Sequence, residues 1–304
     1  MNAQRIVVGV DGSQESRRAL AWAAAEAAAC DGRLLVYRVY PAGLPSPAAG
    51  RSRTPARSAT AVVELADPAL AQALSSVRAR LGGDRIEVAT PTGDPGQRLL
   101  GAGGDLLVVG APRSRAILPR VALPRPSVAR SVAAGARCPV VVARPAAGTR
   151  GLFAGHVVVG VDGGTGARAA LCFGFAYAAR HGLPLAAVHA VGPHHETAPG
   201  DVWVDDRYAE THLAPPPAAL TLLDEEVEPY TREHPEVAVK RAVHRGGAVP
   251  ALRRAAAGAG LLVVGARSHG AATTLTGSTG LGAVGQAMVT HGVGPVAVVH
   301  EPDG

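Results

Sequence analysis

The sequence lacks long hydrophobic runs and recognisable cysteine patterns, and each absence excludes a class of protein. No apolar stretch reaches the ~20 residues that a membrane-spanning helix requires, so we expect no association with a membrane. The three cysteines, Cys30, Cys138 and Cys172, share no metal-ligand spacing, and we interpret them as small packing residues in a reducing compartment. The N-terminus shows no features of a secretory signal, so we expect a cytoplasmic protein.

Lysine and aromatic residues are also scarce. Lysine occurs only at Lys240, and the net charge of +6 comes from arginines spread along the whole chain. Aromatic residues make up 3% of the chain, too few to provide a stacking platform for bases. We therefore expect no nucleic-acid binding, whereas the hydrophobic content of 47% predicts folded globular domains.

What the sequence does contain is an internal repeat. VVGVDG at residues 7–12 returns unchanged at 158–163, and LLVVGA at 106–111 returns at 261–266. The order and approximate spacing of the two segments are kept, which indicates duplication of a domain-sized unit rather than a short solenoid repeat. A chain of 304 residues is long enough for two such domains, each with its own core.

The two copies define the domains and the fold class. We place the first domain at residues 1–145, the second at 154–301, and a short Pro/Gly-containing linker at 146–153. Apolar runs alternate with helical segments in each copy, which predicts parallel strands joined by right-handed crossovers. The fold class is therefore α/β, with two tandem open, twisted, five-stranded parallel sheets that carry helices on both faces.

The expected elements are given by residue number. The strands are 5–10, 34–40, 85–90, 106–109, 138–143, 157–161, 185–191, 237–243, 261–264 and 296–300. The helices are 16–30, 68–81, 96–102, 128–134, 167–180, 218–233, 248–257 and 282–289. Residues 41–60 and a long insertion at 192–219 are expected to be loops.

Ligands of an open parallel sheet bind beyond the carboxyl ends of its strands. Three segments of each copy are expected to converge there: the turn after strand one, the end of strand two, and the loop after strand four. That loop ends at a helix N-terminus, which favours phosphate. The candidate residues are Asp11, Gly12, Val39, Gly110 and Ser127 in the first copy, and Asp162, Gly163, Ala190, Gly265, Ser268, Gly282 and Ala283 in the second.

The repeated segments, with the closing runs CPVVVAR and GPVAVVH, resemble the universal stress protein family and its tandem-domain members. The resemblance implies a Rossmann-like fold of the adenine nucleotide α-hydrolase type. It also implies that ATP or another adenine nucleotide binds with its adenine and ribose against Asp11 or Asp162 and the end of strand two. In ATP-binding members the phosphates lie in a loop of the form G-x2-G-x9-G-(S/T), where the hydroxyl caps the next helix.

The first copy departs from this phosphate loop. Arg113 replaces its second glycine, and Pro126, which has no N–H to donate, precedes Ser127. Several arginines lie between residues 113 and 130. This basic segment has two interpretations: a phosphate site rebuilt on guanidinium groups, or a solvated loop, which we favour.

The second copy departs differently. Ser268 replaces the second glycine, the pair Gly282 and Ala283 stands where Gly-Ser is expected, and the loop is longer than the family pattern. The cap hydroxyl is lost, but additional glycines in this loop offer alternative backbone donors. We therefore expect a nucleotide site to be more plausible in the second copy than in the first.

No metal site or catalytic centre is predicted. His194 and His195 are adjacent in a proline-rich insertion without further ligands at fixed spacing, so we interpret them as part of a surface loop. No Ser-His-Asp arrangement follows from the spacing, and the S-G-G-x-D-S run of pyrophosphatase-type enzymes is absent after strand one. We expect a protein without catalytic residues.

The leading interpretation is a non-catalytic stress-response regulator with degenerate adenine-nucleotide sites and an unidentified regulatory protein partner. The alternatives are a nucleotide-free interaction module, whose basic segment binds an acidic partner, and an enzyme of the adenine-nucleotide hydrolase type. By resemblance, Val140–Ala143 and Val296–Val299 pair the two domains into an internal pseudo-dimer, and a homodimer of chains is possible.

Overall fold

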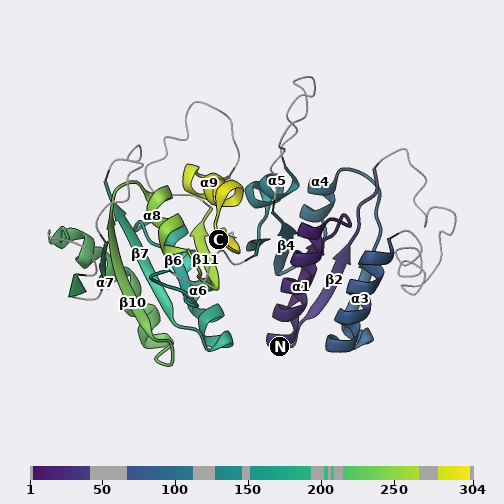
Figure 1. The fold of residues 1–304 in the computed structure, drawn as a ribbon, viewed down its shortest axis with the longest axis horizontal. Helices are drawn as coiled ribbons and strands as arrows, with labels where there is room; N and C mark the ends of the chain where they lie inside the picture. Colours follow the sequence, from purple (N-terminus) through teal and green to yellow (C-terminus); the bar gives the residue numbers. More distant parts are fainter. Residues whose placement is uncertain are drawn as a thin grey trace, which may run out of the picture. The chain divides into compact units, whose positions relative to one another are not determined.

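The protein forms two compact units, Met1–Arg144 and Pro145–Gly304, which we describe separately (Figure 1). The structure is a computed structural model that describes residues 3–41, 67–111, 127–145, 151–192, 202–204, 207–208, 215–266 and 280–301. Most of the expected loop at 41–60 lies outside these residues. Among the helices within them, none combines the length and the hydropathy needed to cross a membrane.

Unit 1 is an α/β domain built on a parallel sheet with strand order β3-β2-β1-β4-β5. Its elements are β1 (Arg5–Gly9), α1 (Gln14–Ala29), β2 (Arg33–Tyr37), α3 (Pro68–Leu81), a 3-10 turn (Gly83–Arg85), β3 (Ile86–Ala89), α4 (Pro95–Leu100), β4 (Leu106–Gly110), α5 (Val128–Gly135) and β5 (Val140–Ala143). The strand order reverses beside β1, because β1 pairs with β2 on one side and with β4 on the other.

Helices cover both faces of this sheet, as the sequence predicted. Helices α1 and α3 pack together on one face, and α4 packs against α5 (Figure 1). A side chain added at Gly9 would meet Leu99 of α4, whereas one added at Gly110 would meet the backbone of α1, so the two helix pairs lie on opposite faces. Because both faces are covered, consecutive β1 residues such as Ile6, Val7 and Val8 are all completely buried.

Unit 2 repeats this arrangement with strand order β12-β11-β6-β7-β10-β8-β9. Its elements are β6 (Val157–Gly160), α6 (Thr165–His181), β7 (Leu185–Val191), β8 (Val202–Val204), β9 (Arg207–Tyr208), α7 (Pro217–Glu233), β10 (Val239–Arg245), α8 (Ala248–Ala255), β11 (Leu261–Gly265), α9 (Ala283–His291) and β12 (Val296–Val299). The strands β12, β11, β6, β7 and β10 are parallel and correspond to β5, β4, β1, β2 and β3 of unit 1.

Three expectations need correction or adjustment. The sheet of unit 2 extends beyond five strands, because the expected 192–219 loop contains β8 and β9. Strand β8 pairs antiparallel with β10, and β9 pairs antiparallel with β8. Val202, Trp203 and Val204 have high strand propensity, but three residues are too few to show a period. Phe153, expected in the linker, is completely buried. Cys172 is exposed, so its interpretation as a packing residue is wrong.

The side chain of Arg85 fastens the end of α1 to the sheet. Its guanidinium donates to the carbonyl oxygens of Ala27 (2.6 Å) and Gly32 (2.8 and 3.0 Å), and pairs with Asp31 at 3.0 Å. Asp31 has a φ of 50°, a conformation that requires local support in a non-glycine residue. A cation at a helix C-terminus also complements the helix dipole.

Replacing this guanidinium is expected to destabilise unit 1. The change Arg85→Ala removes charge-assisted bonds to buried carbonyl groups, which should lower the free energy of unfolding by roughly 1.5–3 kcal/mol. Urea denaturation followed by Trp22 fluorescence, in a Trp203→Phe background, measures the loss in unit 1. Arg80→Ala removes an exposed arginine of α3 as the control, and an equal loss in both variants would contradict this role.

His244 in β10 is only 2% exposed, and its Nε2 has no hydrogen-bond partner among the residues that the structure describes. Burial lowers the pKa of the imidazole to about 4, and the positive charge of Arg254 contributes in the same direction. The folded protein therefore holds this histidine neutral, whereas the unfolded chain protonates it near its ordinary pKa of about 6.5.

The free energy of unfolding should therefore fall as the pH decreases from about 6.5 to about 4. The slope contributed by one proton is at most about 1.4 kcal/mol per pH unit. His244→Phe should remove this slope, whereas the exposed His291→Gln should retain it. Denaturation at several pH values, followed by Trp203 fluorescence in a Trp22→Phe background, measures the pH dependence of the unfolding free energy in both variants. An unchanged slope in His244→Phe would exclude His244 as the source.

Candidate functional site

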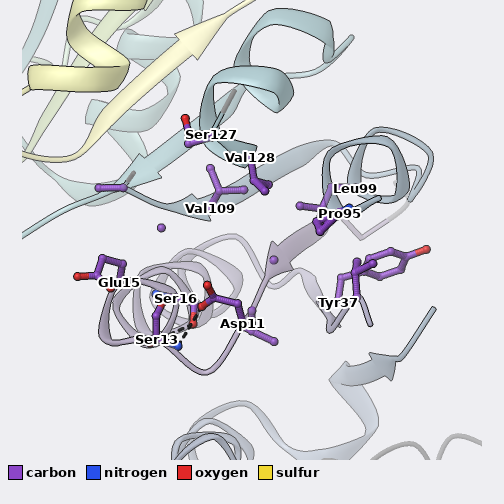
Figure 2. Close-up of a pocket in the computed structure, with 16 residues that line it drawn as sticks. Asp11, Ser13, Glu15, Ser16, Tyr37, Pro95, Leu99, Val109, Ser127 and Val128 are labelled. Atoms are coloured by element: carbon purple, nitrogen blue, oxygen red, sulfur yellow. Dashed lines mark hydrogen bonds between the residues drawn. The ribbon is translucent and has the colours of Figure 1, made fainter. Parts of the chain in front are cut away.

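A cavity of about 310 Å³ lies beyond the carboxyl ends of β1, β2 and β4 in unit 1 (Figure 2). The structure thus brings together the three predicted segments of the first copy and adds α4 as a fourth. The cavity is lined by Gly9, Val10, Asp11, Ser13, Glu15, Ser16, Tyr37, Val39, Pro95, Leu99, Val109, Gly110, Ala111, Ser127, Val128 and Ala129.

One side of the cavity is polar and is formed by the turn between β1 and α1. Asp11 Oδ1 accepts a hydrogen bond from the Ser13 N–H (2.9 Å), and Ser13 Oγ accepts from the Ser16 N–H (3.1 Å). Gly12 has a φ of 83°, which lets the chain turn sharply between strand and helix. Asp11 and Ser13 therefore have structural roles in starting α1, in addition to any contact with a ligand.

The opposite side of the cavity is apolar. Val109 and Val128 face Asp11 and Ser13 across the space, and Pro95 and Leu99 close it beside them (Figure 2). Val128 begins α5 and is 38% exposed, whereas large apolar side chains elsewhere in the described part of the chain are mostly buried. Ser127 caps α5, since its Oγ accepts a hydrogen bond from the Arg130 N–H (3.2 Å).

Sequence reasoning missed the contribution of α4. Pro95 and Leu99 line the cavity because β3 lies next to β2 and its carboxyl end leads directly into this helix. The turn Thr92-Gly93-Asp94-Pro95 was the available signal, since a turn after a strand of a parallel sheet lies at the same edge as the other candidate segments.

Most predicted residues of unit 2 lie at the equivalent edge of their own sheet. Asp162 Oδ1 accepts a hydrogen bond from the Gly164 N–H (3.0 Å), and Gly163 has a φ of 78°, which reproduces the turn of unit 1. Ala190 lies in β7, next to its last residue, and Gly265 ends β11. Gly282 is the N-cap of α9, and Ala283 is the first helical residue. Ser268 lies outside the described residues, as do Arg113, Pro126, His194 and His195.

The two units differ in how the first helix begins. In unit 1 a serine caps α1 and Glu15 lies in its first turn, whereas α6 begins at Thr165 and its N-cap, Gly164, provides no side-chain hydrogen bond. In unit 2 the carboxylate comes from beyond β12, because the Thr165 hydroxyl donates a hydrogen bond to the carboxylate of Glu301. Both helix N-termini thus have a nearby anion, which complements their dipoles.

The glycine that ends β4 in unit 1 and β11 in unit 2 is required by packing. An added Cβ at Gly110 would lie 2.8 Å from the Glu15 backbone, and one at Gly265 would lie 2.6 Å from the Gly166 backbone. Neither backbone segment can yield as a flexible side-chain end would. These glycines therefore let the first helix approach strand four closely, whether or not a ligand is bound.

The site residues form no recognisable metal centre: no group of three or more potential ligands occurs in the described ranges. The Nδ1 atom of His189, one of the histidines of unit 2, lies 2.8 Å from the carbonyl oxygen of Val161.

Burial raises the pKa of the Cys138 thiol to about 11, so this thiol remains protonated near neutral pH.

Fold and site together define a tandem α/β protein of Rossmann-like architecture, with a ligand-sized cavity at the carboxyl edge of the first sheet. The universal stress protein family matches residues 2–144 and 154–300. The chain therefore belongs to the universal stress protein family.

Individual relatives agree with this assignment. Universal stress proteins MT3220 and Rv3134c, from two strains of Mycobacterium tuberculosis, are 33% identical over 253 residues, which cover 81% of this chain and 82% of each relative. A crystal structure of a universal stress protein from Archaeoglobus fulgidus matches with a TM-score of 0.62 at 17% identity, covering 99% of this chain and all of that one. Protein PA1789 from Pseudomonas aeruginosa has a TM-score of 0.58 at 15% identity, over 99% and 94% of the two chains. These structural matches support the fold.

Adding a methyl group at Gly110, the last residue of β4, should destabilise unit 1 strongly. Gly110→Ala places a Cβ against the backbone of α1, which should cost about 1–3 kcal/mol of unfolding free energy. Gly83→Ala is the matched control in the same unit, because nothing lies within 4 Å of the added Cβ. Chemical denaturation without any ligand compares the two, and equal stability would show that the close approach does not require glycine.

Proposed function

We propose that this universal stress protein is a non-catalytic regulator whose units retain adenine-nucleotide sites of unequal quality. In this proposal, occupancy of the sites changes the loop surfaces that a regulatory protein partner recognises. The proposal also includes pairing between the two units and a cytoplasmic location. Family membership supports it, as does the position of the candidate residues at the carboxyl edge of each sheet.

The observation that carries the proposal is the cavity of unit 1. It lies beside β1, where the strand order reverses, and this is where open parallel sheets bind their ligands. Its volume of about 310 Å³ and its mixture of apolar and polar lining groups are typical of a site for a small organic molecule. Asp11 and Val39 line it together, as the family resemblance implies for adenine and ribose.

Phosphate recognition is better supported in unit 2. The N-cap of α9 is Gly282, which provides no side-chain hydrogen bond to the first N–H groups of this nine-residue helix. Such groups favour an anion, as does the positive end of the helix dipole. Gly166 also stands where unit 1 has Glu15, which removes one carboxylate from this edge. The carboxylate of Glu301, which accepts a hydrogen bond from the Thr165 hydroxyl, instead disfavours phosphate at this edge.

ATP should occupy at most one site per chain, and this site should be in unit 2. Gly282→Asp places a carboxylate at the start of α9, so it should weaken ATP binding at least about tenfold by charge repulsion. Ser127→Asp is the matched change at the start of α5 and should alter ATP affinity less than about twofold. Aspartate is as good an N-cap as serine, so both helices should keep their stability. Equilibrium dialysis with ATP measures the affinity and stoichiometry.

Mass spectrometry of small molecules released from the purified, denatured protein separates this function from its alternatives. Intact ATP or AMP at up to one equivalent per chain supports the regulator. Turnover of added ATP would instead identify an enzyme, and failure to bind any adenine compound would identify an interaction module. Two equivalents of tightly held ATP would contradict the assignment of phosphate binding to unit 2.

A further inference from the structure

We infer that the amino edge of the first sheet is a docking site for a protein partner that inserts an aromatic side chain. The site is a cavity of about 990 Å³ at the start of β1, β2 and β3, which we call the amino-edge cavity. It lies at the opposite end of these strands from the candidate nucleotide site. The inference rests on the proposed function only for the existence of a protein partner, and it adds the place and the chemistry of the contact.

Both apolar and charged groups line the amino-edge cavity. Leu34, Leu35 and Ile86 contribute apolar atoms from β2 and β3. The charged lining groups are balanced in sign, with three arginines and three carboxylates: Arg5, Arg33, Arg85, Asp84, Glu87 and Asp105. A segment that complements this lining therefore carries an apolar group and no large net charge.

Unit 2 shows what occupies the equivalent place. Gly103 and Gly258 follow α4 and α8, and both have a positive φ, of 64° and 74°. Gly103 lines the amino-edge cavity, whereas the carbonyl oxygen of Gly258 accepts a hydrogen bond from the Gly155 N–H (2.9 Å). Residues 151–155 therefore cover, in unit 2, the turn that lines the cavity in unit 1.

An aromatic side chain is the buried part of this segment. Phe153 is completely buried, and its ring meets the ring of His156 edge-on, with the centroids 5.9 Å apart. His156 corresponds to Arg5, because each lies two residues before the repeated VVGVDG segment, and Arg5 lines the amino-edge cavity. By the same alignment Phe153 corresponds to Asn2, which is not aromatic. Unit 2 thus supplies from its own chain an aromatic group that unit 1 does not have at this position.

Helix length also differs between the two units. An added Cβ at Gly9 would meet Leu99 of α4, and one at Gly160 would meet Leu252 of α8, so the two helices pack on equivalent strands. Helix α4 has six residues and α8 has eight, so α4 covers less of its sheet. The volume of about 990 Å³ is at the upper end of the range for ligand sites, which is enough for an aromatic side chain and its flanking backbone.

Two guanidinium groups at the cavity favour an aromatic over an aliphatic side chain. Arg5 and Arg33 begin β1 and β2 and are partners in the register of these strands. Their side chains therefore project to the same face of the sheet. An aromatic ring beside them gains a cation–π interaction that an aliphatic group of the same size lacks.

NMR titration of the isotope-labelled full chain with the peptide acetyl-Gly-Leu-Phe-Ala-Gly-amide tests this inference, because the peptide reproduces residues 151–155. Saturable shift changes are expected at the backbone amides of Arg33, Leu35 and Gly104, which line the cavity. The same peptide with alanine in place of phenylalanine should bind at least about tenfold more weakly. Equal binding of the two peptides, or shift changes confined to other parts of the chain, would overturn the inference.

Gly83→Trp fills the cavity from its own lining. No atom lies within 4 Å of a Cβ added at Gly83, so the larger side chain can be accommodated. It should weaken binding of the phenylalanine peptide at least about tenfold. Ser75→Trp is the matched control, because it adds the same side chain at an exposed position of α3 that does not line the cavity. Circular dichroism verifies that both variants are folded, and equal peptide binding in the two would overturn the inference.

Arg33→Ala is an independent test that does not depend on filling the cavity. Loss of one guanidinium should weaken binding of the phenylalanine peptide about threefold, because the cation–π interaction is lost. Arg80→Ala removes an exposed arginine of α3 and should leave binding unchanged. Equal binding in these two variants would contradict a contact between Arg33 and the ring.

ATP binding to the same samples separates this inference from the proposed function. Gly83→Trp changes the amino edge, so it should alter ATP affinity less than about twofold, since nucleotide is expected beyond the carboxyl ends of the strands. A wild-type chain that binds ATP but not the phenylalanine peptide would overturn the inference and leave the proposed function standing. A chain that binds the peptide but no adenine nucleotide would overturn the nucleotide sites of the proposed function and support the inference.

Discussion

The close approach of the first helix to the fourth strand is the constraint on which each unit depends. At Gly110 and Gly265, a Cβ would lie within 3 Å of the backbone of α1 or α6, so only glycine allows the helix to start there. This contact places the turn after strand one beside the end of strand four. In unit 1 the same geometry creates the cavity, because Asp11, Gly110 and the start of α5 then lie around one space. The close contact between helix and strand and the cavity therefore involve the same residues.

The two units use this common backbone with different charges and caps. In unit 1, Ser13 caps α1 and Glu15 lies in its first turn, so the carboxylate near the N-terminus of α1 belongs to the helix itself. Unit 2 has glycine at the equivalent positions. The carboxylate near the N-terminus of α6 is that of Glu301, which lies after the last strand. In both units a carboxylate therefore lies near the N-terminus of the first helix, but the two carboxylates belong to different parts of the fold. The duplication thus kept the fold and changed the electrostatics.

The sequence allowed prediction of most elements because their signals are local. Helix α3 runs over Pro68–Leu81 as expected, since Asp67 caps it, a proline starts it and Gly82 ends it. The short strand β8 was missed because its support is tertiary: Trp203 pairs with Val243, which is distant in sequence. The same reason explains why Leu99 was absent from the predicted site. Its position in the cavity depends on the pairing of β3 with β2, which brings α4 to the edge.

The repeated motif VVGVDG gives more information about folding than about ligands. Asp11 and Asp162 make the same hydrogen bond to the residue two positions ahead, and the glycines that follow them have similar positive φ values. The repetition of VVGVDG is therefore explained by a turn that both units need, with or without a nucleotide. The copies differ at other positions at this edge of the sheet, such as Glu15 against Gly166 and Ser127 against Gly282. These differences concern charge and capping at helix N-termini, which are the features that decide whether a phosphate is attracted or repelled. The two halves therefore keep the same fold while the N-termini of their helices differ in charge and capping.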